Sequence, residues 1–388
     1  MVSIPGRKTY PAAHSQLPNR ENWRAKVLVR RTMRKRLRSS LLHALKTAGV
    51  FERVRESRWR QRRLLILCYH GLAIEEENAW RPALFIAPSR LRERFEMLKR
   101  GGYNVIPLGE GLERMRKNDL APRSVVLTFD DGTYDFYKLT YPLLREYGFP
   151  ATVYQTTYYC GRRMPVYSLI CSYMLWKKRD GVLGVTPSIG IEREARLDTP
   201  EARNDVLSQI IAFVERETLS TEQKNEVAAE LARRLGVNYD DLLQQRILQL
   251  MSAEEIAELA GAGINFELHT HRHRTPRDRD LFVREIEDNR RALEEMTGVR
   301  PAHFCYPSGD YDLKFLPWLA QNGVASATTC EGGLASVTSQ PLLLPRFIDT
   351  TGQTELDFES WLTGVGALLS SGTNASGLKR MFGTASHR

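Results

Sequence analysis

Apolar residues along this chain fall into short runs separated by amphipathic stretches. Two runs, residues 64–69 and 124–129, are almost continuously apolar, which is typical of strands buried on both faces of a parallel sheet. Further strands are predicted at residues 151–156, 264–268, 302–306, 325–329 and 342–347. Helical patterns lie between them at residues 89–100, 109–117, 137–147, 277–296 and 312–322. This alternation predicts an α/β protein with a parallel sheet or barrel.

The alternation stops between residues 162 and 263, where the sequence is rich in helical patterns. We interpret this stretch as a helical insertion. Residues 22–63 place Leu, Val and Met among many Arg and Lys, which is typical of a basic amphipathic helix. We therefore expect a basic helical extension over residues 1–63, a domain over residues 64–350, and a tail over residues 351–388 that is poorly ordered where Gly, Ser and Thr dominate.

The composition is that of an ordinary globular protein. The chain has 388 residues, of which 42% are hydrophobic and 9% aromatic. It contains no run of about 18 apolar residues, so a membrane-spanning protein is not expected. The first 18 residues contain three prolines and no apolar stretch, so we expect no conventional secretory signal and a cytoplasmic protein. The five cysteines are odd in number and lack a CxxC spacing, which favours reduced thiols.

The positive charge is confined to one segment. The formal net charge is +10, but residues 1–63 hold 18 Lys/Arg against 3 Asp/Glu, so the remainder is net negative. A basic amphipathic helix over residues 22–63 suits an anionic membrane surface and would bring the protein to the inner membrane face. A solvated basic helix packed on the barrel explains the same pattern equally well. Nucleic-acid binding is the weaker alternative, because the segment contains no recognisable reader fold.

Two neighbouring carboxylates follow the second of the clear strands. Asp130 and Asp131 stand at its carboxyl end, directly before Gly132. Buried carboxylates are costly unless a cation compensates them, so the pair suggests metal binding or proton transfer. Asp-Asp-Gly is also a common turn, and taken alone the turn is the better explanation.

A histidine cluster changes that balance. His269, His271 and His273 are three of the chain's eight histidines, and they directly follow the strand predicted at residues 264–268. One carboxylate and two imidazoles, with a position left for water, are typical donors of a catalytic zinc site. The sequence therefore predicts a divalent metal site, with zinc the best candidate, where these strands end.

These motifs resemble those of a known family. Thr-Phe-Asp-Asp-Gly at residues 128–132, His-Thr-x-x-His at 269–273, Tyr-Pro-Ser-Gly at 306–309 and Leu-Pro-Arg at 344–346 are similar to motifs of the polysaccharide deacetylase family, the NodB-homology or chitin-deacetylase-like carbohydrate esterases. The resemblance covers about residues 64–350. It implies a distorted (β/α) barrel of the NodB-homology or glycoside hydrolase–deacetylase type, with fewer than eight complete units and a helical insertion.

The resemblance also implies an activity. Members of the family are hydrolases of non-peptide carbon–nitrogen bonds, and we expect this chain to remove N-acetyl groups from an N-acetylated sugar in a polysaccharide, an oligosaccharide or a lipid-linked glycan. Carried over by position, Asp130 is the general base, and Asp131, His269 and His273 are the metal ligands. The backbone N–H of Tyr306 is the expected oxyanion donor.

Three features depart from the family pattern. Arg274 follows the last histidine of the second motif, where a proline is usual, and this leaves the shape of that loop open. The third motif has Phe304 and Cys305 where many relatives have an arginine. Arg346 could orient Asp130, or it could be an ordinary ion-pair arginine, and the sequence does not decide between the two.

The third departure is the absence of a late Leu-x-His, which in many members supplies the general acid. His70 is our candidate acid, because it ends the first predicted strand and so shares the barrel mouth with Asp130. His271 is the next candidate, and it also competes with His269 as a ligand. His303 stands at a strand start, which indicates a structural role.

Two other readings of the whole chain remain at this point. The barrel could be a catalytically inactive glycan-binding module, since the late histidine is missing. Alternatively, the chain could act through its basic segment as a nucleic-acid-binding or membrane-binding protein.

Overall fold

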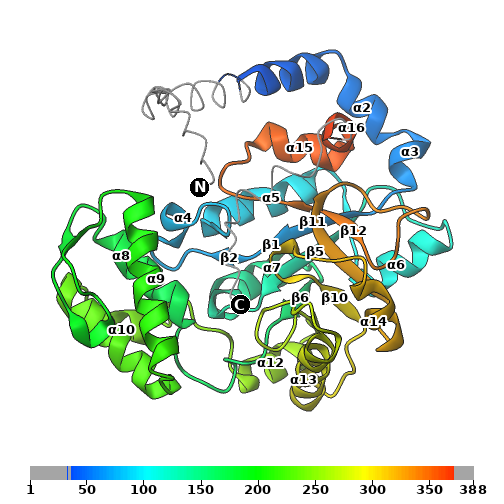
Figure 1. Ribbon diagram of the computed structural model, residues 1–388. Helices are drawn as coiled ribbons and strands as arrows, with labels where there is room; N and C mark the ends of the chain where they lie inside the picture. The colour runs from blue at the N-terminus through cyan, green and yellow to red at the C-terminus, as the bar shows by residue number, and fades with distance from the viewer. Residues whose placement is uncertain (1–32, 34–35, 371–388) are drawn as a thin grey trace, which may run out of the picture. The chain divides into compact units, whose positions relative to one another are not determined.

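The computed structural model describes residue 33 and residues 36–370 (Figure 1). The chain divides into two units, residues 1–49 and residues 50–388. In the first unit, residues 36–47 are helical, within the segment where the basic helix is expected. No helix in the described part of the chain is both long and apolar enough to cross a membrane.

Seven parallel strands close into a barrel in the second unit (Figure 1). In sheet order they are β1 (Leu65–Tyr69), β12 (Leu344–Ile348), β11 (Ser326–Gly332), β10 (His303–Cys305), β9 (Asn265–Leu268), β6 (Thr152–Gln155) and β5 (Ser124–Asp131). The ring closes where β1 pairs with β5, with Leu65 opposite Val125. A further strand, β4 (Asn104–Val105), pairs with the first two residues of β5. The predicted distorted (β/α) barrel is confirmed.

The helices between these strands each bury one apolar face against the barrel. In α5 this face consists of Leu91, Phe95 and Leu98, which are spaced three and four residues apart, as one face of a helix requires. The barrel helices are α5 (Pro88–Arg100), α6 (Leu108–Arg116), α7 (Tyr141–Tyr147), α12 (Ala253–Gly261), α13 (Arg279–Thr297) and α14 (Phe315–Gln321). Shorter elements after β1 are β2 (Gly71–Leu72), α4 (Glu77–Trp80) and β3 (Phe85–Ile86), and a π-helical turn, Phe136–Thr140, precedes α7.

The helical insertion has a hydrophobic core of its own (Figure 1, green). Its helices are α8 (Tyr167–Lys177), α9 (Pro200–Arg216), α10 (Thr221–Leu235) and α11 (Tyr239–Gln244), with a small antiparallel pair, β7 (Val182–Leu183) and β8 (Ala195–Arg196). The insertion is shorter than the expected range of 162–263. Helix α12 belongs to the barrel, because Ile256 and Leu259 lie in the main core.

Both ends of the domain extend beyond the expected range of 64–350. Helices α2 (Val50–Arg55) and α3 (Arg58–Gln61) belong to the second unit, and the buried Arg60 donates from Nε to the carbonyl of Leu362. The expected tail begins instead with α15 (Glu355–Thr363) and α16 (Val365–Ser370). Trp361 of α15 stacks on Phe347 of β12, with ring centroids 4.6 Å apart. Helices α15 and α16 are not evident from the sequence, because Gly, Ser and Thr are frequent within and around them.

Candidate active site

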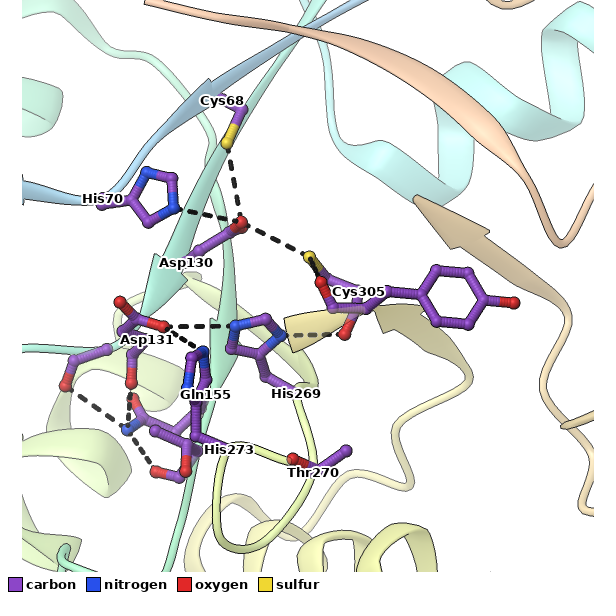
Figure 2. Close-up of polar contacts among 12 residues, drawn as sticks. Cys68, His70, Asp130, Asp131, Gln155, His269, Thr270, His273 and Cys305 are labelled. Atoms are coloured by element: carbon purple, nitrogen blue, oxygen red, sulfur yellow. Dashed lines mark hydrogen bonds and ion pairs between the residues drawn. The ribbon is translucent and has the colours of Figure 1, made fainter. Parts of the chain in front are cut away.

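Four strands bring polar side chains to one end of the barrel (Figure 2). Asp130 and Asp131 end β5, Cys305 ends β10, His269 directly follows β9 and His70 directly follows β1. The carboxyl ends of parallel strands open on the same face of a barrel, and this topology collects residues that are far apart in the sequence.

Asp131, His269 and His273 direct donor atoms toward one another. Asp131 Oδ1 lies 3.2 Å from His269 Nε2 and 3.1 Å from His273 Nε2, and the donor atoms of the three residues all lie within 4.8 Å of one another. His269 Nδ1 lies 2.8 Å from the carbonyl oxygen of Cys305, to which a proton on Nδ1 would donate. That tautomer leaves the lone pair of Nε2 facing Asp131. A carboxylate with two neutral imidazoles is a donor set that fits zinc or a similar divalent metal.

Two of the three donor residues are partly exposed. His269 is buried, whereas the side chains of Asp131 and His273 are 28% and 39% exposed. Three protein donors with an open side are the arrangement of catalytic rather than structural zinc sites.

The backbone is strained at these residues. The φ angle is 73° at Asp131, 62° at Thr270 and 55° at His273, in the left-handed region that non-glycine residues rarely adopt. Each such residue costs on the order of 1 kcal/mol or more, so surrounding contacts must hold it in place. Strain of this kind clusters at functional sites, and here it lies on two of the three donor residues.

Gln155 provides one of these contacts (Figure 2). Its amide nitrogen donates to the carbonyl of Thr156 at 2.8 Å and lies 3.3 Å from the carbonyl oxygens of Asp131 and Gly132. A Cβ at position 132 would come within 1.8 Å of Gln155 Oε1, and φ there is 73°, so only glycine fits. The sequence gives no signal for Gln155 beyond its place at the end of a buried strand.

Arg346 forms a buried pair with Asp130. Its Nη1 and Nη2 atoms lie 2.7 Å from Oδ1 and Oδ2 of Asp130, and its Nε donates to the carbonyl of Thr329. Burial alone would raise the pKa of Asp130, but the Arg346 charge and its hydrogen bonds outweigh burial and hold that pKa well below its usual range. Arg346 is therefore in a position to orient Asp130, because it bonds to both oxygens of that carboxylate.

Two thiols adjoin the same carboxylate. Sγ of Cys305 lies 3.3 Å and Sγ of Cys68 lies 3.6 Å from Asp130 Oδ2. Asp130, His269 and Cys305 also have donor atoms close enough to suggest a metal site. Arg346 argues against an ion there, because its Nη2 lies 3.1 Å from Cys305 Sγ, and burial raises the pKa of that thiol. All five cysteines are free thiols, as predicted.

His70 also lies beside Asp130. Its Nε2 is 3.9 Å from Asp130 Oδ2, and its side chain is 13% exposed. Burial lowers the pKa of His70, although the negative charges of Asp130 and Asp131 partly oppose this effect. Burial is the larger of these effects and favours the neutral ring.

The backbone of Tyr306 does not fit the role expected for it. Its N–H donates to the carbonyl of Thr328 at 3.2 Å, within the pairing of β10 and β11, and is not free to bind an oxyanion. The side chain is buried, and its hydroxyl donates to the carbonyl of Leu342. Our assignment of Tyr306 as the oxyanion donor is therefore wrong for this structure, because the sheet already uses that donor.

His271 and His303, the two remaining histidines considered in the sequence, lie elsewhere. His271 Nδ1 lies 2.8 Å from Thr157 Oγ1, and its ring packs edge-on against Tyr158, outside the donor set of His269 and His273. His303 lies at the amino end of β10, the opposite end from the site, with Nδ1 2.8 Å from Ser326 Oγ. Burial lowers the pKa of His303 to about 4.

Comparison with known proteins shows which family part of the chain resembles. The polysaccharide deacetylase family model matches residues 117–176 and 217–327, which include the two carboxylates, the histidine loop and the buried strands that carry them. Over these residues the chain resembles the polysaccharide deacetylase family. The gap in the match lies within the helical insertion, and β1 and β12, which carry His70 and Arg346, lie outside the match.

Two curated polysaccharide deacetylases resemble part of the chain. The poly-β-1,6-N-acetyl-D-glucosamine N-deacetylases of Escherichia coli K12 and O157:H7 are each 32% identical over 97 residues, which are 25% of this chain and 14% of each relative. The solved structure of the Streptococcus pyogenes deacetylase PplD in complex with acetate covers 78% of this chain and 97% of its own, with a TM-score of 0.51 and 19% identity. That likeness shows the same fold.

Proposed function

We propose that this chain is a metal-dependent hydrolase of the polysaccharide deacetylase family that removes N-acetyl groups from a glycan containing N-acetylglucosamine. The observation that carries the proposal is the convergence of Asp131, His269 and His273 beside the buried pair of Asp130 and Arg346. The poly-β-1,6-N-acetyl-D-glucosamine N-deacetylases that the chain resembles supply the substrate class.

Asp131, His269 and His273 would hold the metal. When bound, a divalent ion in such a site supplies Lewis-acid polarisation of a carbonyl group and makes water more acidic. Among the residues of this chain, Asp130 accepts the proton of the attacking water, because it lies beside the donor set and is not part of it. Arg346 fixes the orientation of Asp130 through both carboxylate oxygens.

His70 completes the proton route. The leaving amine needs a proton, because an amine anion is too poor a leaving group to depart unaided. Burial favours the neutral form of His70, so the proton it delivers is one that Asp130 has first taken from the attacking water. Asp130 Oδ2 and His70 Nε2 lie 3.9 Å apart, so a bridging water molecule passes the proton between them. The products are acetate and a free amine, and the chain returns to its initial protonation state.

Acetate release from defined oligomers tests the proposal. Purified protein loaded with zinc should release acetate from β-1,6-linked N-acetylglucosamine oligomers. Treatment with a chelator should abolish the activity, and added zinc should restore it. Comparison with β-1,4-linked oligomers and an O-acetylated glycan defines the substrate. A metal-loaded protein that releases acetate from none of them would instead support an inactive glycan-binding barrel.

A further inference from the structure

Two buried polar residues of α13 bond to the loop that carries two of the proposed metal ligands. Residues 269–274 follow β9 and lie over α13, where Glu285 and Asn289 stand one helical turn apart. Glu285 is 1% exposed and Asn289 is not exposed at all. Their neighbours on the buried face of α13 include the apolar Ile286 and Leu293, so polar residues there require specific partners.

Asn289 joins the start of the loop to β6. Its Oδ1 accepts the backbone N–H of His269 at 2.9 Å. Its Nδ2 donates to the carbonyl of Gln155 and to Oγ1 of Thr157, both at 3.0 Å. The Asn289 side chain therefore fixes the backbone of His269 to β6. The same strand contains Gln155, which contacts the backbone of Asp131.

Glu285 holds the rest of the loop. Its Oε2 accepts the backbone N–H of Arg272 at 2.8 Å, and its main-chain carbonyl accepts the N–H of His271 at 3.1 Å. Its Oε1 accepts from Nη1 of Arg272 at 3.1 Å and from Nε of Arg274 at 2.8 Å. A buried carboxylate is costly unless it is paired and hydrogen-bonded, and here both cations come from the loop itself.

The contacts of Arg274 show how the loop keeps its shape without the proline that is usual at this position. Arg274 stands where relatives commonly have a proline, so the loop lacks the rigidity that proline would give. The Arg274 side chain instead reaches Glu285, and its backbone N–H donates to Thr270 Oγ1 at 3.0 Å. The strained backbone of Thr270 and His273 is thereby enclosed between Asn289 at one end and the Glu285 ion pairs at the other.

We propose that Glu285 and Asn289 are positioning residues for the metal site, which set the shape of the loop that carries His269 and His273. Neither residue touches the donor atoms, and both act through the backbone and through the two loop arginines. The inference rests on the proposed metal site. According to this inference, Glu285 and Asn289 strengthen metal binding as well as stabilising the barrel.

Zinc affinity and a cobalt spectrum test this inference. Glu285→Gln keeps the size of the side chain and removes its charge, and Asn289→Leu removes all three hydrogen bonds. Each variant should bind zinc roughly 10–100-fold more weakly than the wild type in competition with a chromophoric chelator, the usual effect of losing an outer-shell partner. The visible absorption of the cobalt-substituted protein should also change, because it reports the geometry around the ion and a general loss of stability would not alter it.

Two further variants complete the design. Glu287→Gln is the matched control, because Glu287 is exposed on the same helix, and it should bind zinc as the wild type does. Arg274→Gln covers the case in which a buried substitution prevents folding. Its side chain is 56% exposed, so the protein should fold, and zinc binding should again weaken.

The outcomes separate the two proposals. The positioning role would be overturned if Glu285→Gln and Asn289→Leu bind zinc as tightly as the wild type and have an unchanged cobalt spectrum. If those two variants do not fold, the same result in Arg274→Gln would overturn it. A wild-type protein that binds neither zinc nor cobalt would instead overturn the proposed metal site. Weaker binding in Glu287→Gln as well would show that any charge change on α13 has the same effect, and this also counts against the inference.

Discussion

Loss of Arg346 should reveal how strongly the barrel depends on the buried pair at its mouth. Arg346 is fully buried and makes two charge-assisted hydrogen bonds of 2.7 Å to Asp130. Hydrogen bonds to charged groups contribute about 1.5–3 kcal/mol each, so the two together correspond to about 3–6 kcal/mol. Breaking a buried pair by removing one partner usually costs about 3–5 kcal/mol. We therefore expect Arg346→Met to lower the free energy of unfolding by about 3–5 kcal/mol at pH 7.5.

The pH dependence of this loss has a definite sign. Without Arg346, burial raises the pKa of Asp130 in the folded state above its unfolded value, so the folded protein takes up a proton more readily. The free energy of unfolding of Arg346→Met should therefore rise again as the pH falls from 7.5 toward 5. Asp130→Asn combined with Arg346→Met removes both charges, and it should cost less than the sum of the two single substitutions.

Urea unfolding followed by tryptophan fluorescence measures these quantities, provided that each variant unfolds in a single transition. Arg92→Met is the matched control, because it breaks an exposed arginine–glutamate pair with Glu146 on the same domain and should change the free energy of unfolding far less than Arg346→Met does. An Arg346→Met variant within 1 kcal/mol of the wild type, or a double variant whose loss equals the sum of the single losses, would refute this reasoning.

Three further predictions concern different parts of the chain. His70→Ala should keep the fold and the bound metal while kcat falls roughly 10²–10⁴-fold, and a near-normal kcat would exclude His70 as the acid. Burial raises the pKa of Asp135 to about 7, above its unfolded value, so its contribution to stability is greatest at low pH and declines as the pH rises toward 7. Between pH 5 and pH 8 the free energy of unfolding should therefore fall less in Asp135→Asn than in the wild type. Plots of that free energy against pH that run parallel for the two proteins would contradict this. Residues 22–63 should bind anionic vesicles at low salt in a flotation assay, since Met33, Leu37 and Leu41 form an exposed apolar stripe among basic residues, and failure to float would contradict membrane association.

The positions of the main strands and the polar residues at their ends could be predicted because both depend on short-range patterns. The apolar runs identify strands buried on two faces, and Asp130, Asp131 and His269 each stand directly at or after a strand end. In a parallel barrel those ends share one face, so their proximity follows without knowledge of the exact register. His70 could be placed at the same mouth by the same argument.

The contacts of Tyr306, Arg346 and Asn289 could not be predicted, because they depend on which distant segments of the chain pack together. Tyr306 has the sequence context of an oxyanion donor, but the alignment of β10 with β11 gives its N–H to Thr328. Arg346 faces Asp130 because β12 closes the barrel beside β1, a contact between the two ends of the domain. Asn289 reaches His269 from a helix 20 residues away, and its only sequence signal is a polar residue at a core-facing position of an amphipathic helix.

The central claim is that Asp130 is the base beside a metal held by Asp131, His269 and His273. The most direct test measures, on the same preparations, bound zinc per chain and acetate released from a β-1,6-linked N-acetylglucosamine oligomer by the wild type and by Asp130→Asn. We expect about one zinc per chain in both proteins and acetate release only by the wild type. Full acetate release by Asp130→Asn, or activity in a wild type that contains no metal, would contradict the account.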